Sequence, residues 1–157
     1  MDKINEIFLN DKYIKLLNEL NELEENRVFC KHGIEHFLDV ARIAYIKVLE
    51  NNLSYSKEVI YAIALLHDIG RVLEYKANIP HHEASVIEAE DILSQTTYST
   101  EEIGEIIKAI SMHRKEADDE LAKIIYESDK QSRNCFSCKS EKECYWSKEK
   151  KNFNITY

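Results

Sequence analysis

Apolar side chains recur three or four positions apart along most of the chain, in segments separated by short polar stretches. Such positions share one face of a helix, so each segment predicts an amphipathic helix. The predicted helices start near residue 4, as one helix or a broken pair ending near 25–27, and then cover 34–49, a stretch after Ser54 or Ser56, about 82–95, a stretch after Ser99 or Thr100, and about 116–132. Only 3 glycines and 1 proline interrupt the chain, which favours long helices over many short strands.

The third predicted helix contains the run VIYAIALLH, which is apolar almost all round and therefore predicts the most buried helix. Gly70 offers a stop for this helix, and residues 71–80 predict a loop. After Arg133 the helical period ends, which predicts an irregular tail with one short helix near Trp146. The expected fold is all-α, a single-domain bundle of about six helices. Residues 1–133 would form the helical domain, and residues 134–157 a cysteine-bearing extension packed on it.

Composition narrows the function classes. A chain of 157 residues is expected to form one core. The net charge is −8 and no stripe of Lys or Arg interrupts it, so a nucleic-acid polymer is not expected as a partner. No apolar run reaches the roughly 18 residues that span a bilayer, and the charged first segment does not resemble a signal peptide. We therefore expect a cytoplasmic protein without a membrane partner. The sequence does not predict its oligomeric state.

His67 and Asp68 close the most apolar helix, in the string LLHDIG. A buried, ionised aspartate needs a partner, so this pair indicates a shared cation or a strong polar network. The alternative is a helix end at which His67 interacts favourably with the helix dipole while Asp68 meets solvent. His36 and Asp129 also fall on the inward side of their predicted helices. Helical bundles build metal sites from side chains that converge in this way.

The order His36, His67-Asp68 and Asp129 resembles the H…HD…D signature of the HD-domain metal-dependent phosphohydrolase superfamily. The strings HFLDVA and LLHDIG carry the resemblance, which spans residues 32–130. It implies a helical fold in which these four residues ligate one metal ion.

His82 and His113 resemble the additional histidines of the binuclear branch of that superfamily. With Asp68 as a bridge they would hold a second ion. His82 is favoured over His81 because it lies three residues before Ser85 in the string HEAS. His32 is either a residue that supports the site or, as the favoured interpretation, an exposed loop histidine.

Imidazole and carboxylate ligands together suit Fe, Mn, Co, Ni or Zn, so one or two divalent transition metal ions are expected. Such ions activate water, which gives Asp68 a catalytic role. Arg71 follows the HDIG string at a position where this branch often has lysine, and it would hold a substrate phosphate unless it is only a solvent-exposed charge. The resemblance thus implies a hydrolase of a small phosphorylated metabolite, such as a nucleotide or dinucleotide. The alternatives are a binuclear-iron oxygenase and a non-catalytic nucleotide-binding or sensory module.

Cys135 and Cys138 form a C-x2-C pair, and Cys144 follows. This spacing is the usual half of a structural zinc site, and Cys30 would supply the fourth ligand. Four thiolates also suit an iron–sulfur cluster. The alternative is a set of unconnected thiols. Disulfides are not expected in a reducing compartment.

Overall fold

The computed structural model describes residues 1–113 and 118–157, and this part of the chain contains helices and no strand. The helices are α1 (Asp2–Phe8), α2 (Asp11–Leu23), α3 (Ile34–Glu50), α4 (Lys57–Leu66), α5 (Arg71–Ala77), α6 (His81–Leu93), α7 (Thr100–Met112) and α8 (Glu120–Gln131), followed by a 3-10 turn, η1 (Cys135–Ser137). The all-α fold class is confirmed. Eight α-helices are described where about six were predicted, because the first predicted segment is a broken pair and because α5 lies in a predicted loop.

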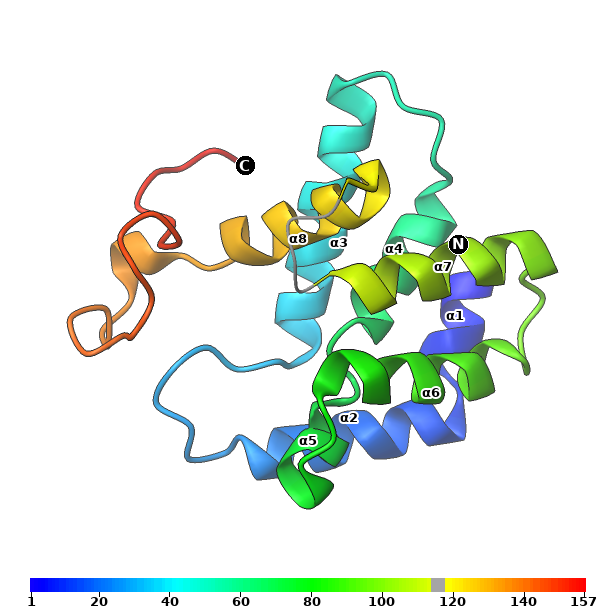
Figure 1. The fold of residues 1–157 in the computed structure, drawn as a ribbon, viewed down its shortest axis with the longest axis horizontal. Coiled ribbons are helices and arrows are strands. Elements are labelled where there is room, and N and C mark those ends of the chain that lie inside the picture. The colour runs from blue at the N-terminus through cyan, green and yellow to red at the C-terminus, as the bar shows by residue number, and fades with distance from the viewer. Residues whose placement is uncertain (114–117) are drawn as a thin grey trace.

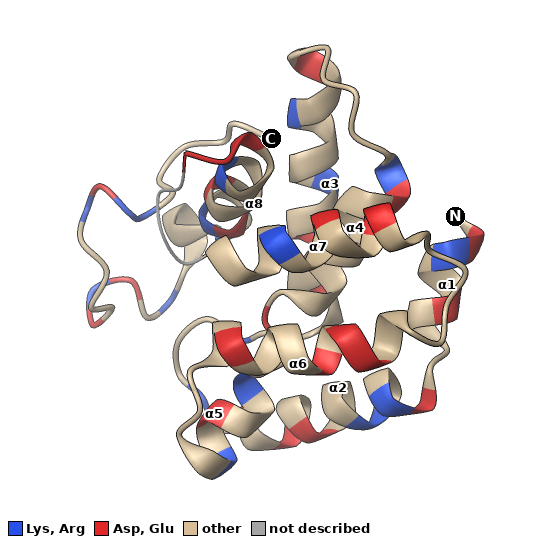
Figure 2. Cartoon of the chain, turned by 45° about the vertical axis from the view of Figure 1, so that its right-hand side comes forward, with Lys and Arg blue, Asp and Glu red and all other residues tan. Residues whose placement is uncertain are grey.

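The helices pack around α3 and α4 (Figure 1). α3 contacts α4 and α8, α7 contacts both α4 and α6, and α5 lies against α2 and α6. Seven of the ten residues of α4 are buried, as its apolar sequence predicts. Figure 2 shows the same contrast, since α4 carries charges only at its first residues while α6 and α7 expose several acidic ones. The burial of α4 places its C-terminal end in the interior of the bundle.

Local capping fixes where several helices begin. The Ser56 hydroxyl accepts a hydrogen bond from the Glu58 N–H at 3.2 Å, so Ser56 and not Ser54 caps α4. Ser99 caps α7, and it shares a capping box with Glu102. The predicted start of the last helix, Glu116, lies outside the described residues; α8 begins at Glu120.

The prediction of a loop over residues 71–80 is wrong for its first part, because α5 covers Arg71–Ala77. α4 ends at Leu66, and after a short turn the chain starts α5. Gly70 has an ordinary helical φ of −68°, so it is not a left-handed helix stop. It is needed for space: a Cβ there would lie 2.2 Å from the backbone nitrogen of Ser85 and 2.5 Å from the carbonyl oxygen of His81. This close approach lets α6 lie directly against the turn after α4.

The tail also differs from the prediction. Its helical turn is η1 at Cys135–Ser137, and no helix is described near Trp146. The tail folds back onto the segment between α2 and α3, where the rings of Phe29 and Tyr145 meet edge to face with centroids 5.9 Å apart. The division of the chain at residues 133 and 134 stays a prediction. No helix in the described ranges is long and apolar enough to cross a bilayer.

Gly70, in the turn between α4 and α5, and Gly104, in α7, allow a matched test of this packing. We expect Gly70→Ala to lower the free energy of unfolding by about 3 kcal/mol, because the added methyl group meets backbone that cannot move aside. Gly104→Ala serves as the control, since its Cβ would have no neighbour within 4 Å. It should instead raise stability by about 0.5–1 kcal/mol. Urea unfolding of both variants measures the difference, and equal stabilities would contradict the close approach.

Candidate metal centre

His67 and Asp68 lie in the turn after α4, inside the bundle. His67 is fully buried and Asp68 is only 3% exposed, so the alternative in which Asp68 meets solvent is wrong. The helix orients the imidazole, because Nδ1–H of His67 donates to the carbonyl of Ala64 at 2.8 Å. The opposite ring nitrogen, Nε2, then lies 3.5 Å from Oδ2 of Asp68.

α3 and α8 bring His36 and Asp129 to the same place. Nε2 of His36 lies 3.2 Å from Oδ1 of Asp129. The Ser132 hydroxyl donates to the carbonyl of Asp129, so it accepts from Nδ1–H of His36, 3.1 Å away. A set of four ligand atoms, each within 4.8 Å of the others, comes from His36, His67, Asp68 and Asp129.

A second group shares Asp68. Nε2 of His81 lies 3.2 Å from Oδ1 of Asp68, and Nε2 of His113 lies 3.6 Å from the same oxygen. Nδ1 of His81 is held by Glu74 at 3.0 Å, and Nδ1–H of His113 donates to the carbonyl of Ile110 at 2.5 Å. The ligand atoms of Asp68, His81 and His113 again lie within 4.8 Å of one another.

The structure does not bring the predicted ligand His82 into this second group. Its imidazole is 28% exposed and lies 3.9 Å from Glu83, whereas His81 is buried. α6 begins at His81, and its buried face runs from there through Ala84, Ser85 and Glu88. A shift of one residue turns a helical side chain by about 100°, which directs His82 elsewhere. His81, the alternative, therefore takes the place of His82 as the candidate ligand.

Several buried polar atoms at the centre lack a hydrogen-bond partner among the described residues. Nε2 of His36, His67 and His113 and Oδ1 of Asp68 have no hydrogen-bond partner among the described residues. Buried polar atoms without partners are rare, because leaving water without a new bond costs free energy. Here they converge from α3 and from the C-terminal ends of α4 and α7 onto common points, and a cation would satisfy all of them. The donor set fits a transition metal.

Electrostatics favour the ligand forms of these side chains. Burial lowers the pKa of His67 to about 3, so its imidazole is neutral at pH 7. Burial alone would raise the pKa of Asp68, but His67 and Arg71 hold that pKa well below its usual value. Metal binding requires a neutral imidazole and an ionised carboxylate, so neither residue needs to lose a proton before it binds.

Two residues at the site were missed or misplaced from the sequence. His32 is buried rather than exposed, and its Nε2 lies 3.7 Å from Oδ2 of Asp68. The backbone N–H of His32 donates to Oε2 of Glu24 at 2.6 Å, and Nδ1 of the His32 ring lies 2.7 Å from Oε1 of the same carboxylate. The hydroxyl of Tyr75 also donates to Glu24, at 2.7 Å. Glu24 stands in the acidic string NELEEN, where nothing in the sequence separates it from its solvent-exposed neighbours.

Basic side chains surround the centre in this acidic chain. Arg71 begins α5, and its Nε lies 3.2 Å from Oδ2 of Asp68, so it is not merely a surface charge. A cavity of about 120 Å³ is lined by Arg27, Arg71 and Arg133 together with Asp68 and Asp129. A neighbouring cavity of about 210 Å³ is lined by Asp68, Arg71, His81, His113, Tyr126, Asp129, Lys130, Trp146 and Lys150.

The four cysteines are all free thiols, and all four line one further cavity. The described structure thus brings Cys30 next to the three cysteines of the tail. The ligand assignment of this group stays a prediction.

Comparison with known proteins gives the family of the chain. A model of the HD domain matches residues 33–134. An uncharacterized protein from Clostridium beijerinckii is 45% identical over 157 residues, which is the full length of both chains. No solved structure matches the chain.

Replacing the two adjacent histidines separately tests the ligand set. We expect His81→Ala to lower the transition-metal content by about one equivalent per chain, because it removes an imidazole that faces Asp68. His82→Ala is the matched control and should leave the metal content unchanged. Elemental analysis of the purified variants gives the stoichiometry, and circular dichroism verifies that both remain helical. Loss of metal from His82→Ala but not from His81→Ala would show that the assignment is reversed.

Proposed function

The chain belongs to the HD-domain family, and from this premise we propose that it is a metal-dependent hydrolase of a small phosphorylated metabolite, such as a nucleotide or dinucleotide. In this proposal His36, His67, Asp68 and Asp129 hold one ion, and Asp68, His81 and His113 hold a second. Transition metals bound in this way supply Lewis acidity: they lower the pKa of a water molecule and polarise a phosphoryl oxygen.

The observation that carries the proposal is the gathering of guanidinium groups beside the candidate ligands. The chain has a net charge of −8, which would repel a phosphorylated substrate. Yet Arg27, Arg71 and Arg133 line one cavity with Asp68 and Asp129. Guanidinium groups bind phosphate oxygens through paired N–H donors, and they keep their charge at every physiological pH. The local field at this cavity therefore favours an anion despite the overall charge.

Arg71 is the best placed of the three for a direct contact with substrate. Its Nε faces Asp68 and its Nη1 lies 3.4 Å from Oε2 of Glu74. The two carboxylates hold the guanidinium at the edge of the metal centre, and its remaining N–H groups are available for a phosphate. In this role Arg71 binds and orients the substrate, while Asp68 holds the metal ions.

The size of the site limits how much of a substrate it can enclose. Two cavities that include Asp68 measure about 120 and 210 Å³, below the usual range of about 300–1,000 Å³ for drug-sized ligands, so either would enclose the phosphate end of a nucleotide or dinucleotide and not the whole molecule. Lys130 and Lys150 line the larger of the two, and either could contact a second phosphate. A phosphate ester or a short polyphosphate fits this distribution of charge.

The decisive experiment is a panel of phosphomonoesters, nucleotides and dinucleotides incubated with protein loaded separately with Mn, Fe, Co, Ni or Zn. Release of inorganic phosphate or nucleotide monophosphate that depends on the metal and is lost in Asp68→Ala supports the proposal. An oxygen electrode runs in parallel on the iron-loaded protein. Oxygen consumption without phosphate release would overturn the hydrolase in favour of an oxygenase, and tight nucleotide binding without turnover would overturn it in favour of a sensory module.

Arg71→Ala should separate substrate binding from metal binding. We expect kcat/KM to fall about tenfold to a hundredfold, as the loss of a charged hydrogen bond to phosphate implies. The metal content should remain close to that of the unchanged protein, because Arg71 supplies no ligand. Arg42→Ala is the control, since Arg42 is 59% exposed and pairs only with Asp39 among the ion pairs described. Steady-state kinetics and elemental analysis measure the two effects, and equal kcat/KM values for both variants would exclude a substrate contact by Arg71.

A further inference from the structure

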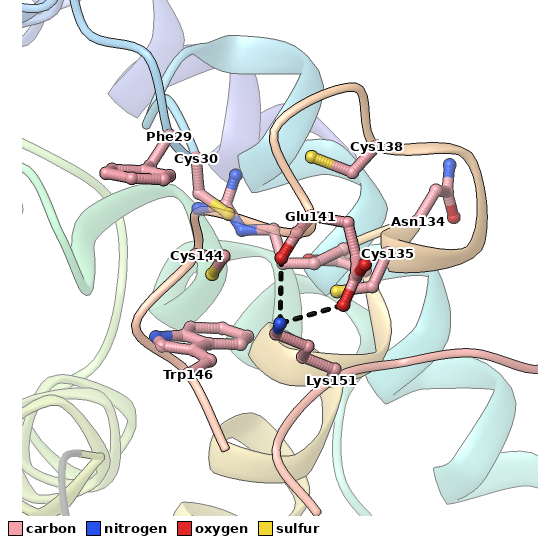
Figure 3. Close-up of a pocket in the computed structure, with 11 residues that line it drawn as sticks. Phe29, Cys30, Asn134, Cys135, Cys138, Glu141, Cys144, Trp146 and Lys151 are labelled. Atoms are coloured by element: carbon pink, nitrogen blue, oxygen red, sulfur yellow. Dashed lines mark hydrogen bonds and ion pairs between the residues drawn. The ribbon is translucent and has the colours of Figure 1, made fainter. Parts of the chain in front are cut away.

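The four cysteines surround one cavity although they are distant in sequence. Cys30 lies between α2 and α3, Cys135 lies in η1, and Cys138 and Cys144 follow in the tail. Figure 3 shows all four sulfur atoms around the same space. The cavity measures about 240 Å³. The chain contains 4 cysteines, so every thiol that it has is gathered here.

The spacing of the thiols decides between the two kinds of cysteine site. A single zinc ion with Zn–S bonds of about 2.3 Å holds its four sulfurs roughly 3.8 Å apart and leaves no space between them. Among the described residues, no set of three ligand atoms within 4.8 Å of one another includes a cysteine sulfur. In a cubane cluster each thiolate binds a different iron atom, so the sulfurs stand further apart around an inorganic core. We propose that Cys30, Cys135, Cys138 and Cys144 hold a [4Fe–4S] cluster in this cavity.

The charges around the cavity suit such a cluster. Four thiolates give a [4Fe–4S] cluster a net negative charge, which a buried site must offset. Arg133 and Lys151 line the cavity, and the side chain of Lys151 is only 8% exposed. Its Nζ donates to the carbonyl and to Oε1 of Glu141, both at 2.8 Å.

The backbone that presents the thiols is held by hydrogen bonds. The N–H of Cys138 donates to the carbonyl of Cys135 at 3.3 Å, which closes the turn between them. On the opposite side, Nε of Arg27 donates to the carbonyl of Cys30 at 2.8 Å. Phe29 and Trp146 add apolar walls to part of the cavity. The cavity is therefore a constructed site and not a gap between loose thiols.

The proposed cluster lies beside the candidate metal centre. Cys30, Cys144 and Trp146 line the cavity that contains Asp68 and Asp129, and Trp146 also lines the cysteine cavity. Trp146 is the only tryptophan of the chain. Its fluorescence therefore reports on the wall that the two sites share, and a bound iron–sulfur cluster would quench it.

The experiment uses the full chain, purified without oxygen and then reconstituted with ferrous iron and sulfide under reducing conditions. We expect about four acid-labile sulfides per chain, visible absorption of a brown protein and quenched Trp146 fluorescence. Sulfide is the decisive count, because iron bound at Asp68 brings none. A protein that contains zinc at the cysteines, or that retains no sulfide after reconstitution, would overturn the proposal.

Cys30→Ser is the sharpest variant, because Cys30 lies far from the other three cysteines in sequence. We expect it to lose at least half of the sulfide and to recover Trp146 fluorescence. In separate samples loaded with manganese alone, the manganese content of the variant should equal that of the unchanged protein. Ser137→Ala is the control, since Ser137 lies in η1 between two of the ligands and should keep the full sulfide content. Far-ultraviolet circular dichroism confirms that both variants are folded. If Cys30→Ser retains the sulfide and the visible spectrum of the unchanged protein, the four-cysteine assignment is wrong.

Discussion

The buried carboxylate of Asp68 is the constraint on which the rest of the structure depends. An ionised carboxylate inside a helical bundle is costly unless opposite charge or donors surround it. Asp68 is placed there because α4 is apolar on nearly every face and must be buried, which carries the residues after it into the interior. At Gly70 the backbone of the turn after α4 packs closely against α6. The next residue, Arg71, begins α5 and lies beside Asp68. The imidazoles around Asp68 are its polar neighbours, and in the proposed function those of His67, His81 and His113 would be metal ligands.

The five buried histidines share one mode of orientation. In each ring Nδ1 lies within hydrogen-bond distance of a nearby acceptor, and Nε2 faces the carboxylate of an aspartate. The acceptors are Glu24 for His32, Ser132 for His36, the carbonyl of Ala64 for His67, Glu74 for His81 and the carbonyl of Ile110 for His113. Anchoring the outer nitrogen fixes the ring and the tautomer, which is how proteins usually present histidine to a metal ion. The candidate ligands are therefore already oriented by the protein, and little side-chain conformational entropy would be lost if an ion bound.

The sequence predicts most of the fold because burial imposes a helical period on long segments. The same periods place His36, His67, Asp68 and Asp129 on inward faces or at helix ends, and it is the resemblance to the HD signature that joins these four residues into one predicted ligand set. The sequence does not distinguish His81 from His82. Which of the two faces the interior depends on the residue at which α6 begins, and Pro80 allows the helix to start at either one. α5 was missed because its seven residues bury only Val72, too few for a visible period. Glu24 was missed because its role comes from a long-range contact with His32 and Tyr75, which no local pattern contains.

The segments on either side of the matched HD domain form part of the walls around the candidate metal centre. The HD-domain match covers residues 33–134, and the ligands of the candidate metal centre all lie within it. Arg27, Cys30 and His32 precede the match, while Cys144, Trp146 and Lys150 follow it. Both flanks line the smaller cavity beside Asp68, whereas only the C-terminal flank, through Trp146 and Lys150, lines the larger one. The matched domain therefore contains the candidate ligands, whereas the flanks add part of the surface that a substrate would meet. A cluster bound by cysteines from both flanks would link the two segments covalently. It would then stabilise the shape of the substrate site without contributing ligands to the metal ions at Asp68.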